Sequence, residues 1–263
     1  MSNDNGANVT GNEKSTGVGD KQEKGFMPTS DEDNSYSSFP DRDLKQGPKP
    51  WTLKDILYYD FRGPLLHNRC ELNVIHCARH DPLIRLMLRA LKSHGCEMKF
   101  SRHFSCERCV GKANGGYDTV MNQVVVCENV TRGRDGVCSV VAHELTHAFD
   151  KCRAKIDFTN LEHLACTEIR ASIFSHCNFA TALANREASM WEYTKSHQAC
   201  VKNKAMMSVM AARDVTPDKA MEAIDKVFDK CYADLEPVGR IPRKFTRDSN
   251  LSLVEGELYG YID

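Results

Sequence analysis

The sequence has no long apolar runs and almost no net charge, and these two features exclude whole classes of protein. No apolar segment approaches the roughly 20 residues that a helix needs to cross a bilayer, so we expect no membrane-spanning segment. The 35 Lys and Arg residues nearly balance the 36 Asp and Glu residues, which leaves a net charge of -1. Such a balance gives no broad attraction for nucleic acid or for an anionic membrane surface. We therefore expect no nucleic-acid partner.

Aliphatic side chains are almost absent from residues 1–48, which consist mainly of small and polar residues. Such a segment cannot bury enough apolar surface to offset the entropy of ordering, so we predict a disordered tail. It contains neither the apolar core of a secretory signal peptide nor the arginine-rich amphipathic helix of a transit peptide. We therefore expect neither of these targeting signals. The chain as a whole is 41% hydrophobic, enough for a real core. We predict one domain over 49–245, with a cysteine-rich helical C-terminal part, and a C-terminal tail over 246–263.

Cysteine, in contrast, is abundant, and all twelve cysteines lie from Cys70 onward. A protein of a reducing compartment rarely contains so many cysteines unless these are buried or bind zinc. We favour disulfides and an oxidising compartment, while the simpler alternative treats several cysteines as small buried apolar residues.

Two more specific predictions follow from cysteine positions. Cys106 and Cys109 form an isolated CxxC pair, which Cys127 and Cys138 could complete as a four-thiolate zinc site. Cys200 and Cys231 lie on two successive predicted helices that could pack antiparallel, so a disulfide between them is our first choice.

Hydrophobic periodicity predicts an α+β fold in which a small antiparallel or mixed sheet is followed by helices. Asp81 before a proline, and Gly95 after the last apolar repeat, mark the two ends of one helix. Asn160 and Thr216 are expected to be N-caps of two later helices. The predicted strands are 96–100 and 119–130, and the predicted helices are 81–95, 136–152, 160–177, 197–214 and 216–239.

The stretch VAHELTHAFD contains the motif H-E-x-x-H at His143, Glu144 and His147. On a helix over 136–152 the two histidines and Asp150 share one side, opposite a broad apolar side. Imidazoles four residues apart are separated by about 6 Å along the axis, so both can bind one Zn²⁺ at about 2.0–2.1 Å. Glu144 points elsewhere and can reach a water, as in zinc peptidases. The alternative is a surface helix with incidental histidines.

A catalytic zinc usually has a third protein ligand, and Glu168 is the best candidate. It lies 21 residues after His147 on a helix face of small and apolar residues, where a carboxylate needs a cation. The alternative is an ion pair with an arginine. Asp150 lies about 10.5 Å from His143 along the axis, too far for the same coordination sphere. We expect it outside that sphere, orienting His147 or binding Arg170, or as an ordinary surface carboxylate.

Two other histidines and one strand are weaker candidates. His163 and His176 could stabilise an oxyanion, although spacing does not assign this role to either. The strand around Met121 to Cys127 could bind a substrate backbone as an added edge strand, with a plain core strand as the alternative.

HELTHAFD at 143–150 and HLACTEIRA at 163–171 resemble the mitochondrial inner-membrane metalloprotease family associated with ATP synthase maturation. The resemblance extends from about Lys54 to Pro242 and includes CENV and the later cysteine-bearing helices. It implies a zincin-like zinc endopeptidase held peripherally on the intermembrane-space side of the inner membrane. Such enzymes trim the precursor of ATP synthase subunit 6 and, with assembly factors, help to assemble the membrane sector. Retention by oxidative folding of cysteines would explain the missing address signal.

Three functional hypotheses remain open at this point. The first is the zinc endopeptidase, with Glu144 as the base. The second is an assembly chaperone that acts independently of proteolysis. The third is a cysteine-rich interaction module with a vestigial motif.

Overall fold

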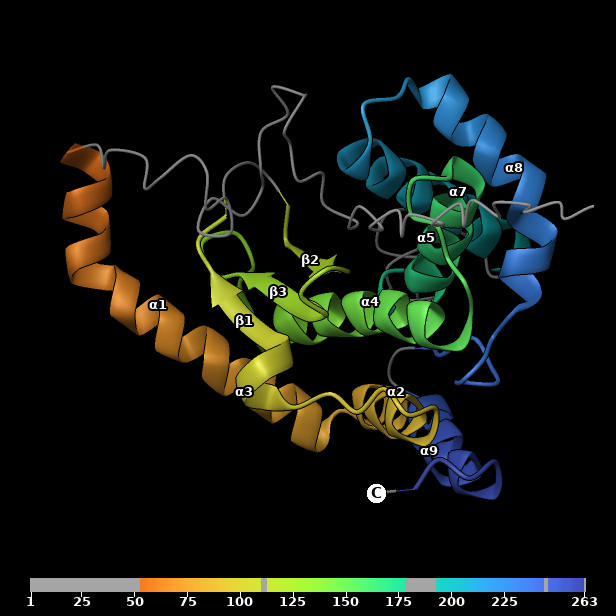
Figure 1. The fold of residues 1–263 in the computed structure, drawn as a ribbon, viewed down its shortest axis with the longest axis horizontal. Helices are drawn as coiled ribbons and strands as arrows, with labels where there is room; N and C mark the ends of the chain where they lie inside the picture. The colour runs from red at the N-terminus through yellow and green to blue at the C-terminus, as the bar shows by residue number, and fades with distance from the viewer. Residues whose placement is uncertain (1–52, 110–112, 178–192, 244–245, 263) are drawn as a thin grey trace, which may run out of the picture.

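The computed structural model describes residues 53–109, 113–177, 193–243 and 246–262 (Figure 1). The prediction of a disordered tail over 1–48 lies outside these residues. The elements are α1 (Leu53–His80), α2 (Pro82–Ser93), α3 (Phe100–His103), β1 (Phe104–Glu107), β2 (Gly115–Asp118), β3 (Gln123–Cys127), α4 (Gly133–Arg153), α5 (Leu161–Ser175), α7 (Tyr193–Ala212), α8 (Pro217–Ala233) and α9 (Asp248–Leu258).

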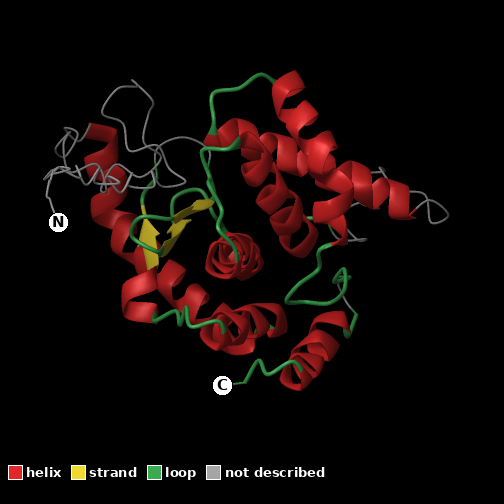
Figure 2. Cartoon of the chain, turned by 45° about the vertical axis from the view of Figure 1, so that its right-hand side comes forward, coloured by secondary structure: helices red, strands yellow, loops and turns green. Residues whose placement is uncertain are grey.

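Helix α4 lies at the centre of the fold. It packs against α1, α2, α5 and the small sheet, and it is buried from Val140 to Asp150. Figure 1 shows α2 and α9 on one side of α4 and α5, α7 and α8 on another. Figure 2 shows that helices make up most of the fold, with the small sheet beside them. The α+β prediction is confirmed at this level, and the helix predicted over 136–152 is observed as Gly133–Arg153.

Local capping signals locate the helix starts correctly. The Asp81 carboxylate accepts hydrogen bonds from the backbone N–H groups of Leu83 and Ile84, at 2.9 and 3.2 Å. Asn160 and Thr216 likewise cap α5 and α8 with their side chains. These contacts satisfy N–H groups that have no partner inside the helix, which is why the residue types predict the boundaries.

The three strands form one mixed sheet in the order β1-β3-β2. Strand β3 pairs parallel with β1 and antiparallel with β2, and its valines are fully buried. The predicted strand 119–130 is thus confirmed only for Gln123–Cys127, because 119–122 form a turn in which Asn122 has φ 52°. Since β3 is central, both of its edges are occupied. The hypothesis that this strand binds substrate as an edge strand is therefore wrong.

The predicted strand 96–100 is also wrong. The segment turns away from α2 through a hydrogen bond from Cys96 N to Leu91 O, and a disulfide joins Cys96 to Cys152 at the end of α4. Phe100 already begins helix α3 and stacks on Phe104 at 5.0 Å. The alternating apolar residues of this segment thus belong to a connection between α2 and α3 that a disulfide joins to α4.

The C-terminal residues are part of the fold and differ from the predicted tail. Helix α9 packs against α2, and Arg89 forms an ion pair with Glu257 at 3.2 Å. Gly256 allows this close approach, because a Cβ there would lie 2.5 Å from Leu86 Cδ1. Helix α1, which the sequence pattern did not predict, packs on α4 and β1.

All twelve cysteines form disulfides, which confirms the disulfide hypothesis and excludes the four-thiolate zinc site. The pairs are Cys70–Cys106, Cys77–Cys138, Cys96–Cys152, Cys109–Cys127, Cys166–Cys231 and Cys177–Cys200. The predicted bridge between Cys200 and Cys231 is wrong. Helices α7 and α8 both pack against α5, so Cys166 in α5 and Cys177 just after it supply the partners.

Candidate metal centre

Three buried side chains from two helices converge beside α4. His143 and His147 come from α4, and Glu168 comes from α5. His143 Nε2 lies 3.2 Å from Glu168 Oε2, and His147 Nε2 lies 3.5 Å from Glu168 Oε1. One nitrogen or oxygen atom from each of the three side chains lies within 4.8 Å of the others. The burial of both histidines contradicts the alternative of a surface helix with incidental histidines.

The surroundings of these residues favour a neutral His147 and an ionised Glu168, while they favour the protonated form of His143. Burial lowers the pKa of His147 to about 4, against the opposing effect of Glu168. Burial would raise the pKa of Glu168, but the nearby His147 and His143 outweigh burial and lower this pKa. For His143 burial is likewise outweighed, because Glu168, 3.2 Å from its Nε2, raises its pKa.

Glu144 differs from the other three residues. Burial raises its pKa to about 7, although the charge of His143 opposes this. A group with a pKa near neutrality can both take up and release a proton at working pH. Among the described residues, Glu144 Oε2 is buried with no hydrogen-bond partner. The carboxylate thus has an atom free for a water or substrate.

The set of residues fits a metal ion. Two imidazole nitrogens and one carboxylate oxygen are the protein ligands of a class of catalytic zinc sites that keep the fourth position open. A buried carboxylate without an arginine or lysine beside it is costly unless another cation balances it. The structure brings together the three predicted ligands, and their ligation of a metal stays a prediction.

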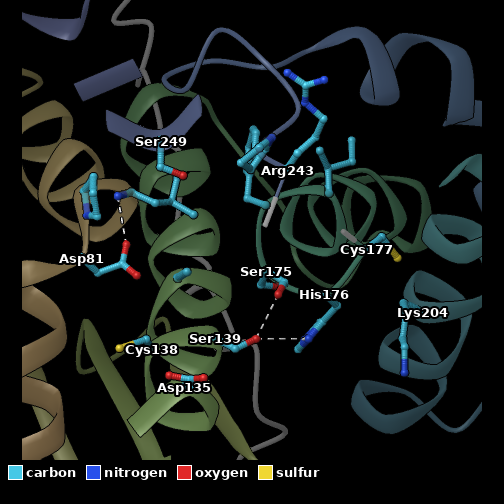
Figure 3. A pocket seen from close by; sticks show the side chains of 16 residues that line it. Asp81, Asp135, Cys138, Ser139, Ser175, His176, Cys177, Lys204, Arg243 and Ser249 are labelled. Atoms are coloured by element: carbon cyan, nitrogen blue, oxygen red, sulfur yellow. Dashed lines mark hydrogen bonds between the residues drawn. The ribbon is translucent and has the colours of Figure 1, made fainter. Parts of the chain in front are cut away.

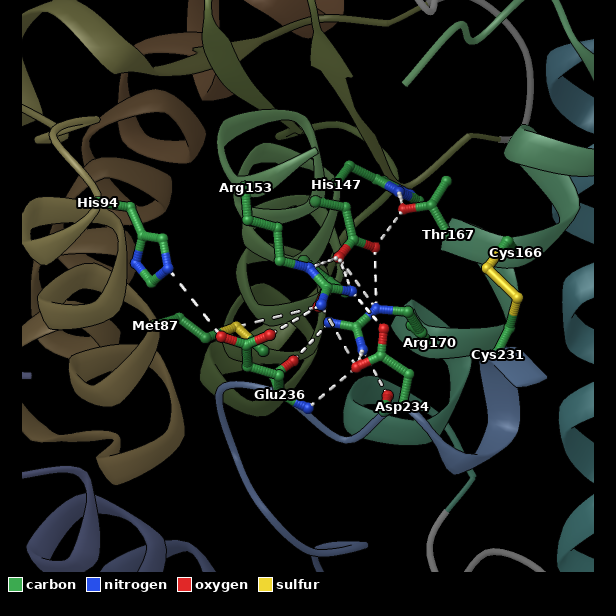
Figure 4. A network of polar contacts seen from close by, with 12 residues as sticks. Met87, His94, His147, Arg153, Cys166, Thr167, Arg170, Cys231, Asp234 and Glu236 are labelled. Atoms are coloured by element: carbon green, nitrogen blue, oxygen red, sulfur yellow. Dashed lines mark hydrogen bonds and ion pairs between the residues drawn. A yellow bond between two sulfur atoms is a disulfide. The ribbon is translucent and has the colours of Figure 1, made fainter. Parts of the chain in front are cut away.

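Asp150 lies on the same helix but is held by other groups. Its Oδ1 accepts a hydrogen bond from Arg170 Nε at 2.9 Å, and Arg153 Nη2 lies 3.0 Å from the same oxygen. Arg170 also reaches the backbone oxygens of Asp234 and Glu236. Figure 4 shows this network beside His147. Of the arrangements expected for Asp150, the structure shows the ion pair with Arg170.

A cavity of about 330 Å³ opens on the metal centre. Its walls are the residues before and at the start of β2, α4, and one side of α7. Gly115 allows β2 to approach α4, because a Cβ there would lie 2.4 Å from Val140 Cγ1 and 2.6 Å from Val125 O. Strand β2, which borders the centre, is an edge strand of the sheet. The sequence pattern did not identify this four-residue, glycine-rich strand.

A second cavity of about 610 Å³ meets the first at His176 and Lys204, which line both (Figure 3). The ring centroids of His176 and His143 are 5.1 Å apart, and Ser139 Oγ lies 3.3 Å from His176 Nδ1. Burial, followed by the charges of His143 and Lys204, lowers the pKa of His176 to about 3. His176 is therefore beside the centre and neutral. His163 lines neither cavity, and its Nδ1 accepts a hydrogen bond from Asp157 N at 3.2 Å.

Comparisons with known proteins agree with this geometry. The model of the peptidase M76 family matches residues 68–239. A relative from Homo sapiens, named mitochondrial inner membrane protease ATP23 homolog, is 39% identical over 182 residues, 68% of this chain and 73% of the relative. The homolog of the same name from Xenopus laevis is 38% identical over 209 residues, 79% of this chain and 85% of the relative. Mitochondrial inner membrane protease atp23 from Emericella nidulans is 36% identical over 179 residues, 66% and 73% of the two chains. No solved structure matches this chain.

Proposed function

Because this chain belongs to the peptidase M76 family of metallopeptidases, we propose that it is a zinc-dependent endopeptidase with a zincin-like active site. The observation that carries the proposal is the convergence of His143, His147 and Glu168 beside the free oxygen of Glu144. In this proposal the first three residues bind Zn²⁺. Two histidines and one carboxylate match the ligand preference of catalytic zinc better than that of magnesium or calcium.

Glu144 acts as the general base and general acid. His143, His147 and Glu168 would hold a zinc ion whose positive charge would acidify a water and polarise the scissile carbonyl. Glu144 takes the proton from the attacking water and later donates it to the nitrogen of the leaving amine. Its pKa of about 7 is suited to both transfers. Glu144 is itself buried in the wall of the cavity.

The edge of β2 that pairs with no other described strand is the proposed track for the substrate backbone. An extended peptide can pair with an exposed strand edge through main-chain hydrogen bonds. Strand β2 borders the cavity that contains Glu144, and its other edge is paired with β3. A peptide added to β2 would place one of its carbonyls near the metal centre.

We further propose that the enzyme acts on the intermembrane-space side of the mitochondrial inner membrane, attached peripherally. The names of the relatives support a location at the mitochondrial inner membrane. Six disulfides are typical of a protein in an oxidising compartment. Among the described helices, none is long and apolar enough to cross a bilayer. The proposed substrate is the precursor of ATP synthase subunit 6, and assembly factors of its membrane sector are the proposed partners.

Assembly of the membrane sector, independent of proteolysis, is the second candidate function. It is favoured by a row of exposed apolar side chains on and after α9: Leu251, Val254, Leu258, Tyr259 and Ile262. Such a row can contact hydrophobic partner segments.

The replacement Glu144→Gln tests the proposal. It preserves size and leaves the three metal ligands in place, so we expect zinc content to stay at the wild-type level. Processing of the subunit 6 precursor should stop, because the base is gone. Metal analysis and anomalous scattering at the zinc edge measure the first result, and the ratio of precursor to mature subunit measures the second.

Each outcome decides between the hypotheses. Unchanged processing by the Glu144→Gln variant would refute the enzymatic proposal. Loss of processing with normal assembly would show that the two functions are separate. A wild-type protein without bound metal would favour the interaction module with a vestigial motif.

A further inference from the structure

Two hydroxyl groups on α5 contact the Nδ1 atoms of the two histidines, on the side of each ring away from Glu168. Thr167 directly precedes Glu168 and is buried, and Ser175 lies two turns later on the same helix. We propose that Thr167 and Ser175 are positioning residues that hold both imidazoles as Nδ1–H tautomers, with the Nε2 lone pairs directed at the metal site. This inference rests on the proposed metal centre.

The direction of the Thr167 hydroxyl follows from the charge of Asp150. Asp150 lies between the guanidinium groups of Arg170 and Arg153, at 2.9 and 3.0 Å. A carboxylate that receives hydrogen bonds from two guanidinium groups acts as a hydrogen-bond acceptor. Thr167 Oγ1 lies 2.8 Å from Asp150 Oδ2. The single hydroxyl hydrogen of Thr167 is therefore donated to Asp150.

The tautomer of His147 follows in turn. Its Nδ1 lies 2.8 Å from Thr167 Oγ1, which has only lone pairs left to offer. Nδ1 must then carry the hydrogen. In a neutral imidazole the other nitrogen, Nε2, is left with its lone pair. That atom faces Glu168 Oε1 at 3.5 Å, so it is the atom available to the metal.

The same argument applies to His143. Ser175 Oγ donates its hydrogen to Ala171 O at 2.6 Å. Its lone pairs accept from His143 Nδ1 at 3.2 Å, and His143 Nε2 faces Glu168 Oε2. The contact between Ser175 and His143 is longer than the contact between Thr167 and His147. The Ser175 hydroxyl also donates to a neutral carbonyl, whereas the Thr167 hydroxyl donates to a carboxylate. We therefore expect Ser175 to contribute less than Thr167.

Helix α5 thus carries both the acidic ligand and the two groups that orient the histidine ligands. The network behind Thr167 is also fixed to the chain after α8, because Arg170 bonds the backbone oxygens of Asp234 and Glu236. Hydrogen bonds of this kind to ligand histidines typically change metal affinity by 10–100-fold.

The experiment compares four variants of the full chain. Thr167→Val keeps the shape and removes the hydroxyl, Thr167→Ser restores a hydroxyl, and Ser175→Ala removes the second one. The matched control is Thr146→Val, because Thr146 is equally buried on α4 but donates to Ala142 O within its own helix. Zinc affinity is measured by competition with a chromophoric chelator. Nitrogen-15 NMR of the metal-free protein reports which ring nitrogen of each histidine carries the hydrogen.

We expect zinc affinity to fall about 10–100-fold in Thr167→Val, to fall less in Ser175→Ala, and to stay near the wild-type value in Thr167→Ser and Thr146→Val. In the wild type, His147 Nδ1 should carry the hydrogen, and this single tautomer should be lost in Thr167→Val. Wild-type affinity in Thr167→Val, equal losses in Thr146→Val, or a hydrogen on Nε2 of wild-type His147 would overturn the proposal. If the wild-type protein bound no zinc, the proposed function would fail, while the NMR measurement would still decide the tautomers.

Discussion

Replacement of Gly115 by alanine should reduce both stability and peptide cleavage, because β2 lies against α4 with no room for a methyl group. The added Cβ would lie 2.4 Å from Val140 Cγ1 and 2.6 Å from Val125 O. Valine is stiff at χ1, and the oxygen belongs to the backbone of the neighbouring strand β3. Neither atom can move far, so β2 itself must shift. Overpacking of this kind costs about 1–3 kcal/mol.

Thermal unfolding measures the loss. In a domain of about 200 residues, 1 kcal/mol corresponds to about 2–4 °C in Tm, so a cost of about 2 kcal/mol lowers Tm by about 4–8 °C. The matched control is Gly136→Ala on α4, where the nearest atom to an added Cβ is Thr131 Cγ2 at 3.5 Å. This is an ordinary contact, and alanine is favoured over glycine in a helix by up to about 1 kcal/mol. Its Tm should be unchanged or higher.

Cleavage of a soluble peptide links the shift of β2 to the site. The same Cβ would lie 3.7 Å from Glu144 Oε1, and a displaced β2 changes the proposed track for substrate. We expect KM to rise while zinc content stays constant, since no metal ligand moves with β2. Adding Val140→Ala should recover part of the loss, because it removes the nearer contact but not the one with Val125 O. Wild-type Tm and kinetics in Gly115→Ala, or an equal drop in Gly136→Ala, would refute this reasoning.

Three further predictions concern charge and covalent links. Replacement of Glu168 by glutamine should lower zinc affinity by more than about 10-fold, because the loss of a metal ligand lowers affinity at least as much as the loss of a group that only orients a ligand. Chelator competition measures this affinity. Burial raises the pKa of Glu144 to about 7 from an ordinary 4.5, so between these values the folded state binds more protons than the unfolded state, and stability falls as pH rises. The metal-free wild type should accordingly lose stability relative to Glu144→Gln between about pH 4.5 and 7, as measured by urea unfolding, and parallel pH profiles would contradict this. Removal of the Cys166–Cys231 disulfide, which closes a separation of 65 residues, by alanine at both positions should cost about 4 kcal/mol, and wild-type stability would contradict this.

Features that depend on local chemistry could be predicted from the sequence. Asp81, Asn160 and Thr216 cap helices because a short polar side chain can reach the free N–H groups of the next turn. The spacing of His143 and His147 brings them together for the same reason, since one helical turn separates them. Such features involve neighbours within four residues, and the rest of the fold hardly changes them.

Features that depend on which elements become neighbours could not be predicted in this way. Helix α1 contains Gly63 and Pro64 inside its span, and this pair normally indicates a turn. The central position of β3 is set by the parallel pairing with β1 and the antiparallel pairing with β2, neither of which leaves a pattern in β3 itself. The disulfide partners of Cys200 and Cys231 likewise depend on how α7 and α8 pack on α5.

The two carboxylates considered as a third ligand, Asp150 and Glu168, are distinguished in the structure by the cations around them. Both are almost fully buried, so each needs positive charge nearby. Asp150 has two guanidinium groups, those of Arg170 and Arg153. Glu168 faces two imidazoles and no guanidinium group: its charge raises the pKa of His143, while His147, with a pKa of about 4, contributes no positive charge at neutral pH. A divalent ion would balance Glu168 in place of a proton on His143, and the same ion would take the Nε2 lone pairs that Thr167 and Ser175 leave directed at it.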